Sequence, residues 1–249
     1  MSSALTLVWR QYRLERRMFW RNPTAAFFNF LFPLILLALF GAVFANDQAN
    51  LNVIVPGIAG MAVMATTFTA LAFSMTFLRE QGVLKRIRGT PLPSGAYLAA
   101  VFASAVANAI LQIVIIVLAG RAFFGIPWPP DPVELVVFAA AGVVCFASLG
   151  IALSHAIPNF ESAPAYTNAI FLPVIFISGV FFDADKAPKF LTDIAEALPL
   201  IHLIDGLSGA MVTGQGLSHH WSDLAVLAVW SAIGIFLAVR GFSWEARRS

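Results

Sequence analysis

Residues 53–78 read "VIVPGIAGMAVMATTFTALAFSMTFL" and contain no charged side chain along their whole length. A helix needs about 20 predominantly apolar residues to cross the hydrocarbon core of a bilayer. A strand of a membrane barrel would alternate apolar and polar residues, and this stretch does not alternate. It therefore predicts a membrane-spanning helix.

Composition extends this prediction to the whole chain. Of the 249 residues, 59% are hydrophobic and 11% are charged, whereas soluble domains carry about 25% charged residues. Such a chain has too little polar surface for a soluble fold of this length. We expect an all-α membrane protein that forms one transmembrane domain, residues 1–249. Its six predicted spans are residues 24–45, 53–78, 96–120, 135–154, 165–182 and 222–241.

Residues 5–21, before the first span, predict an amphipathic helix. Arginines at helical spacing form a basic stripe, and apolar residues that include Trp9 and Tyr12 form a roughly opposite stripe, which Arg16 interrupts. Helices of this type lie in the headgroup layer with Trp and Tyr at the interface. We therefore expect an N-terminal interface helix that ends before Pro23.

A further apolar stretch, residues 199–214, contains His202 and Asp205 and is short for a span. We interpret it as an interfacial or re-entrant helix, within an extracellular segment that comprises residues 183–214. His202 and Asp205 are expected to be buried polar groups that cap helices and seal the outer mouth. A role for this pair in an extracellular gate is a hypothesis.

Basic residues are distributed unevenly between the two ends of the predicted spans. If both termini lie in the cytoplasm, 12 of the 15 lysines and arginines fall on the inner side. Cytoplasmic loops carry an excess of Lys and Arg, so the sequence predicts a multi-pass membrane protein with both termini inside. The basic residues left outside are Arg121, Lys186 and Lys189.

The first inner loop, residues 79–93, reads "REQGVLKRIRGTPLP". Residues 82–88 are long enough for about two helical turns, with the apolar side chains on one side and the basic ones largely on the other. Pro91 and Pro93 would end this helix before the next span. If this loop served only to anchor the topology of the chain, its positive charge alone would be sufficient. A short amphipathic helix tied to two spans is also suited to transmitting force from a soluble partner.

The pattern Arg79-Glu80-x-Gly82-x-Leu84-x-Arg86-x-Arg88-x-Thr90-Pro91 resembles the permease subunits of type-2 ABC exporters, in particular the bacterial drug-export branch. Two later stretches, "FISGVFF" (176–182) and "LPLIHLIDGLSGAM" (198–211), are also similar to that family. The resemblance implies that residues 79–93 form a coupling helix that docks on an ATPase. The implied ATPase-coupling residues are Arg79, Glu80, Gly82, Leu84, Arg86, Arg88, Thr90 and Pro91.

The resemblance also implies an assembly in a bacterial plasma membrane. Two copies of a P-loop ATPase would bind ATP and Mg²⁺, while this chain would bind no cofactor or metal and would not itself be an enzyme. A second permease chain, identical or different, would complete the complex within membrane lipid, and no nucleic acid is expected. Cargo would pass along the permease interface, for which the candidate apolar residues are Phe27, Phe28, Phe32, Phe68, Phe171 and Phe176.

The expected cargo is a hydrophobic or amphipathic compound, such as a drug or a lipid-like molecule; a polysaccharide or glycolipid exporter is the alternative within the family. A gradient-driven transporter is a different class, which usually carries ionisable groups inside the bilayer. The centres of the predicted spans contain none. No lysine follows a glycine, so the chain has no P-loop. An intramembrane hydrolase built on Ser208 would need a histidine base from a later span, and the last histidines, His219 and His220, precede the sixth span.

Overall fold

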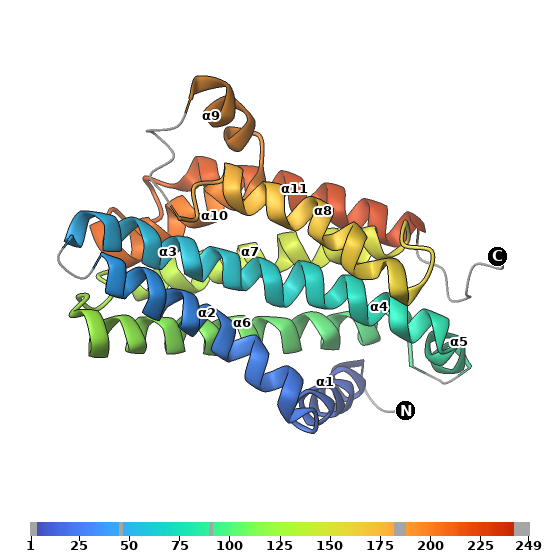
Figure 1. Cartoon of the computed structure of the whole chain (residues 1–249). Coiled ribbons are helices and arrows are strands. Elements are labelled where there is room, and N and C mark those ends of the chain that lie inside the picture. Colours follow the sequence, from blue (N-terminus) through green and yellow to red (C-terminus); the bar gives the residue numbers. More distant parts are fainter. Residues whose placement is uncertain (1–3, 45–46, 90–91, 182–187, 242–249) are drawn as a thin grey trace.

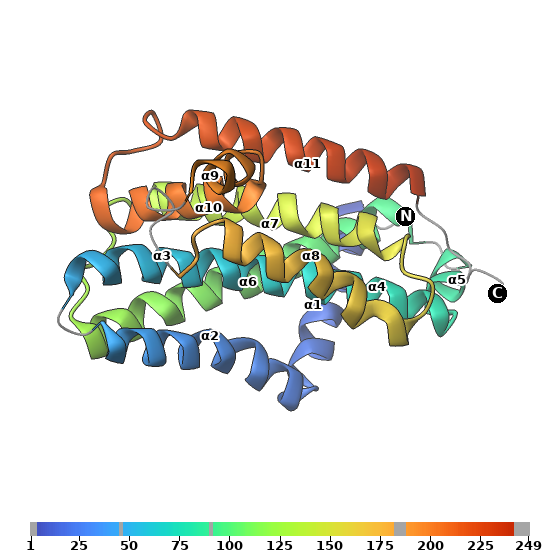
Figure 2. The same ribbon diagram turned by 45° about the horizontal axis from the view of Figure 1, so that its top comes forward.

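The computed structural model describes residues 4–44, 47–89, 92–181 and 188–241, and within these ranges the chain forms helices and no strands. Most of the long helices run along a common direction in a bundle (Figure 1), with α2 (Pro23–Val43) and α11 (Trp221–Gly241) at opposite edges (Figure 2). The predicted all-α membrane fold is confirmed.

Five helical segments of the described chain are long and apolar enough to cross a membrane. The first is continuous from Gln48 to Glu80 and consists of α3 (Gln48–Met64), η1 (Ala65–Thr69) and α4 (Ala70–Glu80). Three others are the single helices α6 (Ser94–Phe124), α7 (Pro132–Ser154) and α11. The remaining segment, Phe160–Ile177, consists of η2 (Phe160–Ser162) and α8 (Ala163–Ile177).

The predicted first span, residues 24–45, corresponds to α2, whose apolar part Asn29–Val43 is shorter than the other spanning helices. Two further helical segments are α9 (Lys189–Glu196) and α10–η4 (Pro199–Ser208 and Gly209–Thr213), which meet at a bend of 89°. Counted together as one broken span, they are long enough to be a sixth span. The predicted fifth span extends to residue 182, but α8 ends at Ile177, before a turn at Gly179.

The helix α3 lies at the centre of the bundle and packs against α2, α6, α7 and α10. It leads into the π-helical turn η1, where the hydroxyls of Thr66 and Thr67 donate to the carbonyls of Ala62 (2.8 Å) and Val63 (2.6 Å). Such side-chain bonds distort the backbone ladder of a helix. A Cβ on Gly150 of α7 would lie 2.4 Å from the carbonyl oxygen of Phe68 in η1, so only glycine permits this approach.

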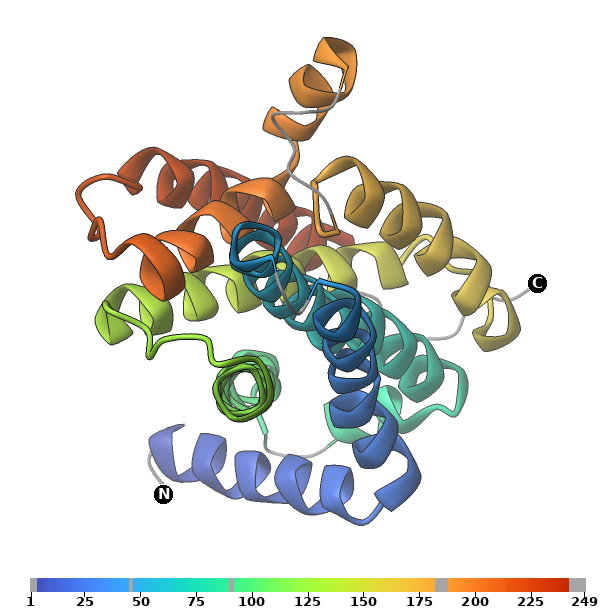
Figure 3. The same ribbon diagram turned by 60° about the vertical axis from the view of Figure 1, so that its left-hand side comes forward.

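The helix α10 lies within the bundle rather than on its surface. It packs against α3, α7 and α11, and Leu200, Leu203 and Leu207 have no exposed surface. In contrast, α9 projects away from the bundle (Figure 3). The connection between η4 and α11 lies at the same end as the α6–α7 connection (Figure 1).

The opposite end of the bundle carries α1 (Ala4–Trp20), α5 (Val83–Arg88) and the last turn of α11 (Figure 1). Rather than running along the bundle, α1 crosses beneath α6, against which it packs (Figure 3). We call this region the basic end, because α1, α5 and the last turn of α11 contribute Arg10, Arg13, Arg16, Arg17, Lys85, Arg86, Arg88 and Arg240.

Candidate functional site

The turn between α4 and α5 depends on Gly82. The backbone N–H of Gln81 donates to Phe77 (2.9 Å) and that of Gly82 donates to Arg79 (3.1 Å), which closes the end of α4. Gly82 has φ +66°, a left-handed conformation that glycine adopts without steric cost. Gly82 therefore sets the direction in which α5 leaves the spanning helix.

Arg79 lies inside the protein at the basic end, with only 5% of its surface exposed. Its guanidinium donates to the carbonyls of Ser154 (2.9 Å) and Ile157 (2.6 Å). Ser154 is the last residue of α7, where carbonyls lack helical partners and a positive charge is favourable. Arg79 thus joins the α4–α5 turn to the connection between α7 and α8.

Glu80 binds the same connection at a second point. Its Oε2 accepts the backbone N–H of Phe160 at 2.7 Å, at the start of η2. The ring of Phe160 packs edge-on against Phe77 and Phe73, with centroids 5.4 and 6.4 Å away. Residues 79–80 and 154–160 therefore form one connected unit, which we call the inner platform.

The outer surface of α5 presents two described basic side chains of the predicted coupling loop. Lys85 and Arg86 are exposed, and Arg86 also donates to the carbonyl of Gln81 at 3.2 Å. The side chains of Leu84 and Arg88, and all of Thr90 and Pro91, lie outside the described residues. The predicted coupling residues therefore have two different environments. Arg79 and Glu80 stabilise the inner platform, whereas Arg86 faces outward beside Lys85.

The N-terminal helix α1 shows why Arg16 interrupts its apolar stripe. The Arg16 guanidinium donates to Asn108 of α6 and lies 5.7 Å from the centre of the Trp20 ring. The neighbouring Glu15 accepts a hydrogen bond from Gln11 at 2.8 Å. Burial raises the pKa of Glu15 above its usual value, and the Gln11 bond offsets part of that rise. The bond between Arg16 and Asn108 links α1 to the spanning helix α6.

The predicted apolar path does not converge within one chain. Phe27, Phe32 and Phe176 are each more than half exposed. Phe171 packs at the edge of the main core, and the side chain of Phe28 lies outside the described part of the chain. Phe68 is buried and lines an apolar cavity between helices.

At the end opposite α5, Asp223 holds two histidines. His202 Nδ1 lies 2.7 Å from Asp223 Oδ1, and His220 Nδ1 lies 3.1 Å from Asp223 Oδ2, with all three side chains about 85% buried. His202 Nε2 also lies 2.9 Å from the carbonyl of Glu196. A carboxylate and a carbonyl are both acceptors, so each ring nitrogen of His202 faces a group to which an N–H could donate. We call His202, His220 and Asp223 the outer latch.

The outer latch ties α10 to the start of α11, and a buried acid lies beside it. A Cβ on Gly209 would be 2.5 Å from His220 Nε2 and 3.3 Å from Glu134 Oε1, so these two side chains meet over Gly209. Glu134 is fully buried. Because α7 begins at Pro132 rather than at residue 135, the sequence-based span boundary excluded this acid by one residue.

Two expectations about this outer region are wrong. Asp205 is exposed and lines a cavity of about 380 Å³ with Ser208 and His219, so it is not a buried cap. His220, which precedes the predicted sixth span and is expected to be an exposed loop residue, is largely buried, as is Asp223 within that span. Within the described part of the chain, no group of three or more His, Cys, Asp or Glu side chains is arranged to hold a metal ion.

Comparison with known proteins assigns the chain to a family. The family model described as ABC-2 type transporter matches residues 3–212. The chain therefore belongs to the ABC-2 type transporter permease family, whose members are not themselves catalytic and normally work with an ATPase subunit.

Three relatives illustrate the range of the family. The putative transport permease ycf38 of Porphyra purpurea is 27% identical, covering 92% of this chain and 84% of the relative. The daunorubicin resistance ABC transporter permease protein DrrB1 of Streptomyces coeruleorubidus is also 27% identical, over 92% and 80%. Nodulation protein J of Sinorhizobium fredii is 25% identical, over 69% of this chain and 66% of its own length.

Proposed function

We propose that this permease exports a hydrophobic or amphipathic compound, such as a drug or a lipid-like molecule, from the cytoplasm or inner leaflet of a bacterial plasma membrane. Two copies of a separate P-loop ATPase supply the energy, and a second permease chain, identical or different, completes the complex. The ATP and Mg²⁺ are bound by the ATPase. Both termini and the inner platform face the cytoplasm.

The observation that carries this proposal is the construction of the inner platform. Arg79 and Glu80 fix the end of α4 to the α7–α8 connection through three hydrogen bonds, while the adjacent α5 presents Lys85 and Arg86 outward. A push on α5 is therefore passed to α4 and, through the inner platform, to α7 and α8. Docking of a partner on α5 converts closure of the ATPases into movement of these helices.

The direction and cargo rest on two further observations. The concentration of basic residues at the α5 end follows the positive-inside pattern. The relative DrrB1 is named for daunorubicin resistance and another relative, LnrN of Bacillus subtilis, for linearmycin resistance, which favours a drug-like cargo. A polysaccharide or glycolipid cargo is the second candidate within the family.

The test is purification of the tagged permease in mild detergent with its ATPase, beside the variant Lys85→Glu/Arg86→Glu. Charge reversal on the exposed face of α5 should abolish ATPase recovery while the permease remains folded. Lys189→Glu, an exposed charge reversal on α9, is the matched control and should recover the ATPase normally. Recovery that is equal in all three samples would refute docking on α5.

A further inference from the structure

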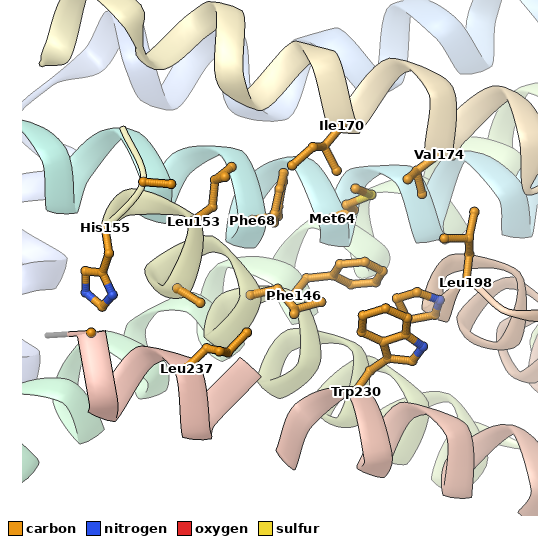
Figure 4. A pocket seen from close by; sticks show the side chains of 15 residues that line it. Met64, Phe68, Phe146, Leu153, His155, Ile170, Val174, Leu198, Trp230 and Leu237 are labelled. Carbon is orange, nitrogen blue, oxygen red and sulfur yellow. The ribbon is translucent and has the colours of Figure 1, made fainter. Parts of the chain in front are cut away.

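An apolar groove runs inside the single chain between α8 and α11 and has α7 as its floor (Figure 4). Its volume is about 550 Å³. Ile170 and Val174 of α8 and Trp230 and Leu237 of α11 line its two sides, with Phe146 between them (Figure 4). Ile170 is 40% and Leu237 48% exposed, so the groove opens sideways onto the surface of the bundle.

The groove occupies only one half of the membrane-spanning length. One end is at Trp230, in the middle of α11, where the indole N–H donates to the carbonyl of Ala197 at 3.1 Å. Its other end is at Gly241 and His155, at the basic end. From Trp230 to Gly241 a helix rises about 16 Å, and one leaflet contributes about 15 Å of hydrocarbon. The groove therefore has the length of one leaflet.

The chemistry of the lining changes only at the end of the groove. All its lining residues are apolar except His155, which lies where α7 ends and beside Gly241. Arg240 occupies the same turn as Gly241, and its guanidinium lies 5.8 Å from the centre of the Phe236 ring. A hydrocarbon chain fits the apolar length, and an anionic headgroup complements the positive charge at its end.

We propose that this groove binds one acyl chain of a phospholipid from the leaflet on the basic side, with the phosphate headgroup near His155 and Arg240. The occupant is a bilayer lipid rather than a second copy of the chain, because the groove matches one leaflet in length and has the Arg240 guanidinium beside it at headgroup depth. That this is the cytoplasmic leaflet rests on the orientation given under the proposed function.

The test uses the full chain with its ATPase in nanodiscs that contain an anionic phospholipid with a diazirine on its acyl chain. After photolysis, mass spectrometry of peptides should place adducts on the groove segments of α7, α8 and α11. Ala152→Phe puts a ring into the groove. Because this removes room for at least two methylene groups, groove adducts should fall by about tenfold.

Two further variants keep the test decisive. Ala156→Phe fills the groove at an exposed lining residue. It replaces Ala152→Phe as the test variant if Ala152→Phe lowers the melting temperature of the protein. Ala232→Phe is the matched control, since Ala232 is exposed on the same half of α11 but does not line the groove. Adducts that persist in both groove variants, or that lie outside the groove, would overturn the proposal. ATPase recovery from the same samples reports separately on the proposed function.

Discussion

Arg79 and Glu80 are adjacent in the sequence, yet they bind different parts of the α7–α8 connection. The sequence identified both as important but assigned them to a partner surface. Burial of Arg79 could not be predicted, because its acceptors lie 75 and 78 residues further along the chain. A charge next to a span is ordinarily solvated, and only the fold brings two carbonyls to it.

Replacing Arg79 tests its role in the inner platform. Arg79→Met keeps much of the side-chain length but leaves the carbonyls of Ser154 and Ile157 without these donors, which should cost roughly 2–3 kcal/mol in unfolding free energy. Thermal unfolding in detergent measures the loss. Arg86→Met, at an exposed position, is the control and should change stability little. Equal stability of the two variants would show that Arg79 does not hold the platform.

The outer latch gives a second prediction for single residues. Asp223→Ala leaves two largely buried imidazoles without their carboxylate, so the unfolding free energy should fall by roughly 2–3 kcal/mol. Asp205→Ala, at an exposed site of the same cavity, should have a small effect. The comparison of their melting temperatures decides whether the latch or Asp205 supports the outer end. If Asp205→Ala is the more destabilising change, the assignment made here is incorrect.

At the scale of the elements, hydrophobic length predicted where the spanning helices lie but not their internal irregularities. The π-helical turn η1 sits inside residues 53–78, which read as an uninterrupted apolar run. Likewise, Glu134 lies one residue before the predicted fourth span, although α7 includes it. Hydropathy records length and composition, whereas these features depend on which helices pack together.

The contact between η1 and α7 is predicted to tolerate no added side chain. Gly150→Ala would place a Cβ 2.4 Å from the Phe68 carbonyl oxygen, so the helices must separate, at a cost of about 1–3 kcal/mol as for other overpacked cores. Gly95→Ala, in α6, has open space around the new Cβ and is the control. The melting temperature should fall only for Gly150→Ala. An unchanged value would mean that η1 and α7 move apart freely.

For the whole molecule, charge distribution and hydropathy together predicted the class of fold and a functional end. The structure places α1, α5 and the end of α11 at the same end of the bundle (Figure 1). The predicted path of phenylalanines is not assembled by one chain, since three of them face outward. A path between two chains leaves no record in the sequence of one, because apolar residues face lipid and partner alike.

Site-specific crosslinking in intact cells shows whether α5 is the contact through which an ATPase drives this permease. A photoreactive amino acid replaces Lys85 on α5 or, in a separate sample, Lys189 on α9, and both side chains are exposed. We expect an adduct with a P-loop ATPase from position 85 and none from position 189. An ATPase adduct from position 189, or none from position 85 despite ATP-dependent export, would contradict it.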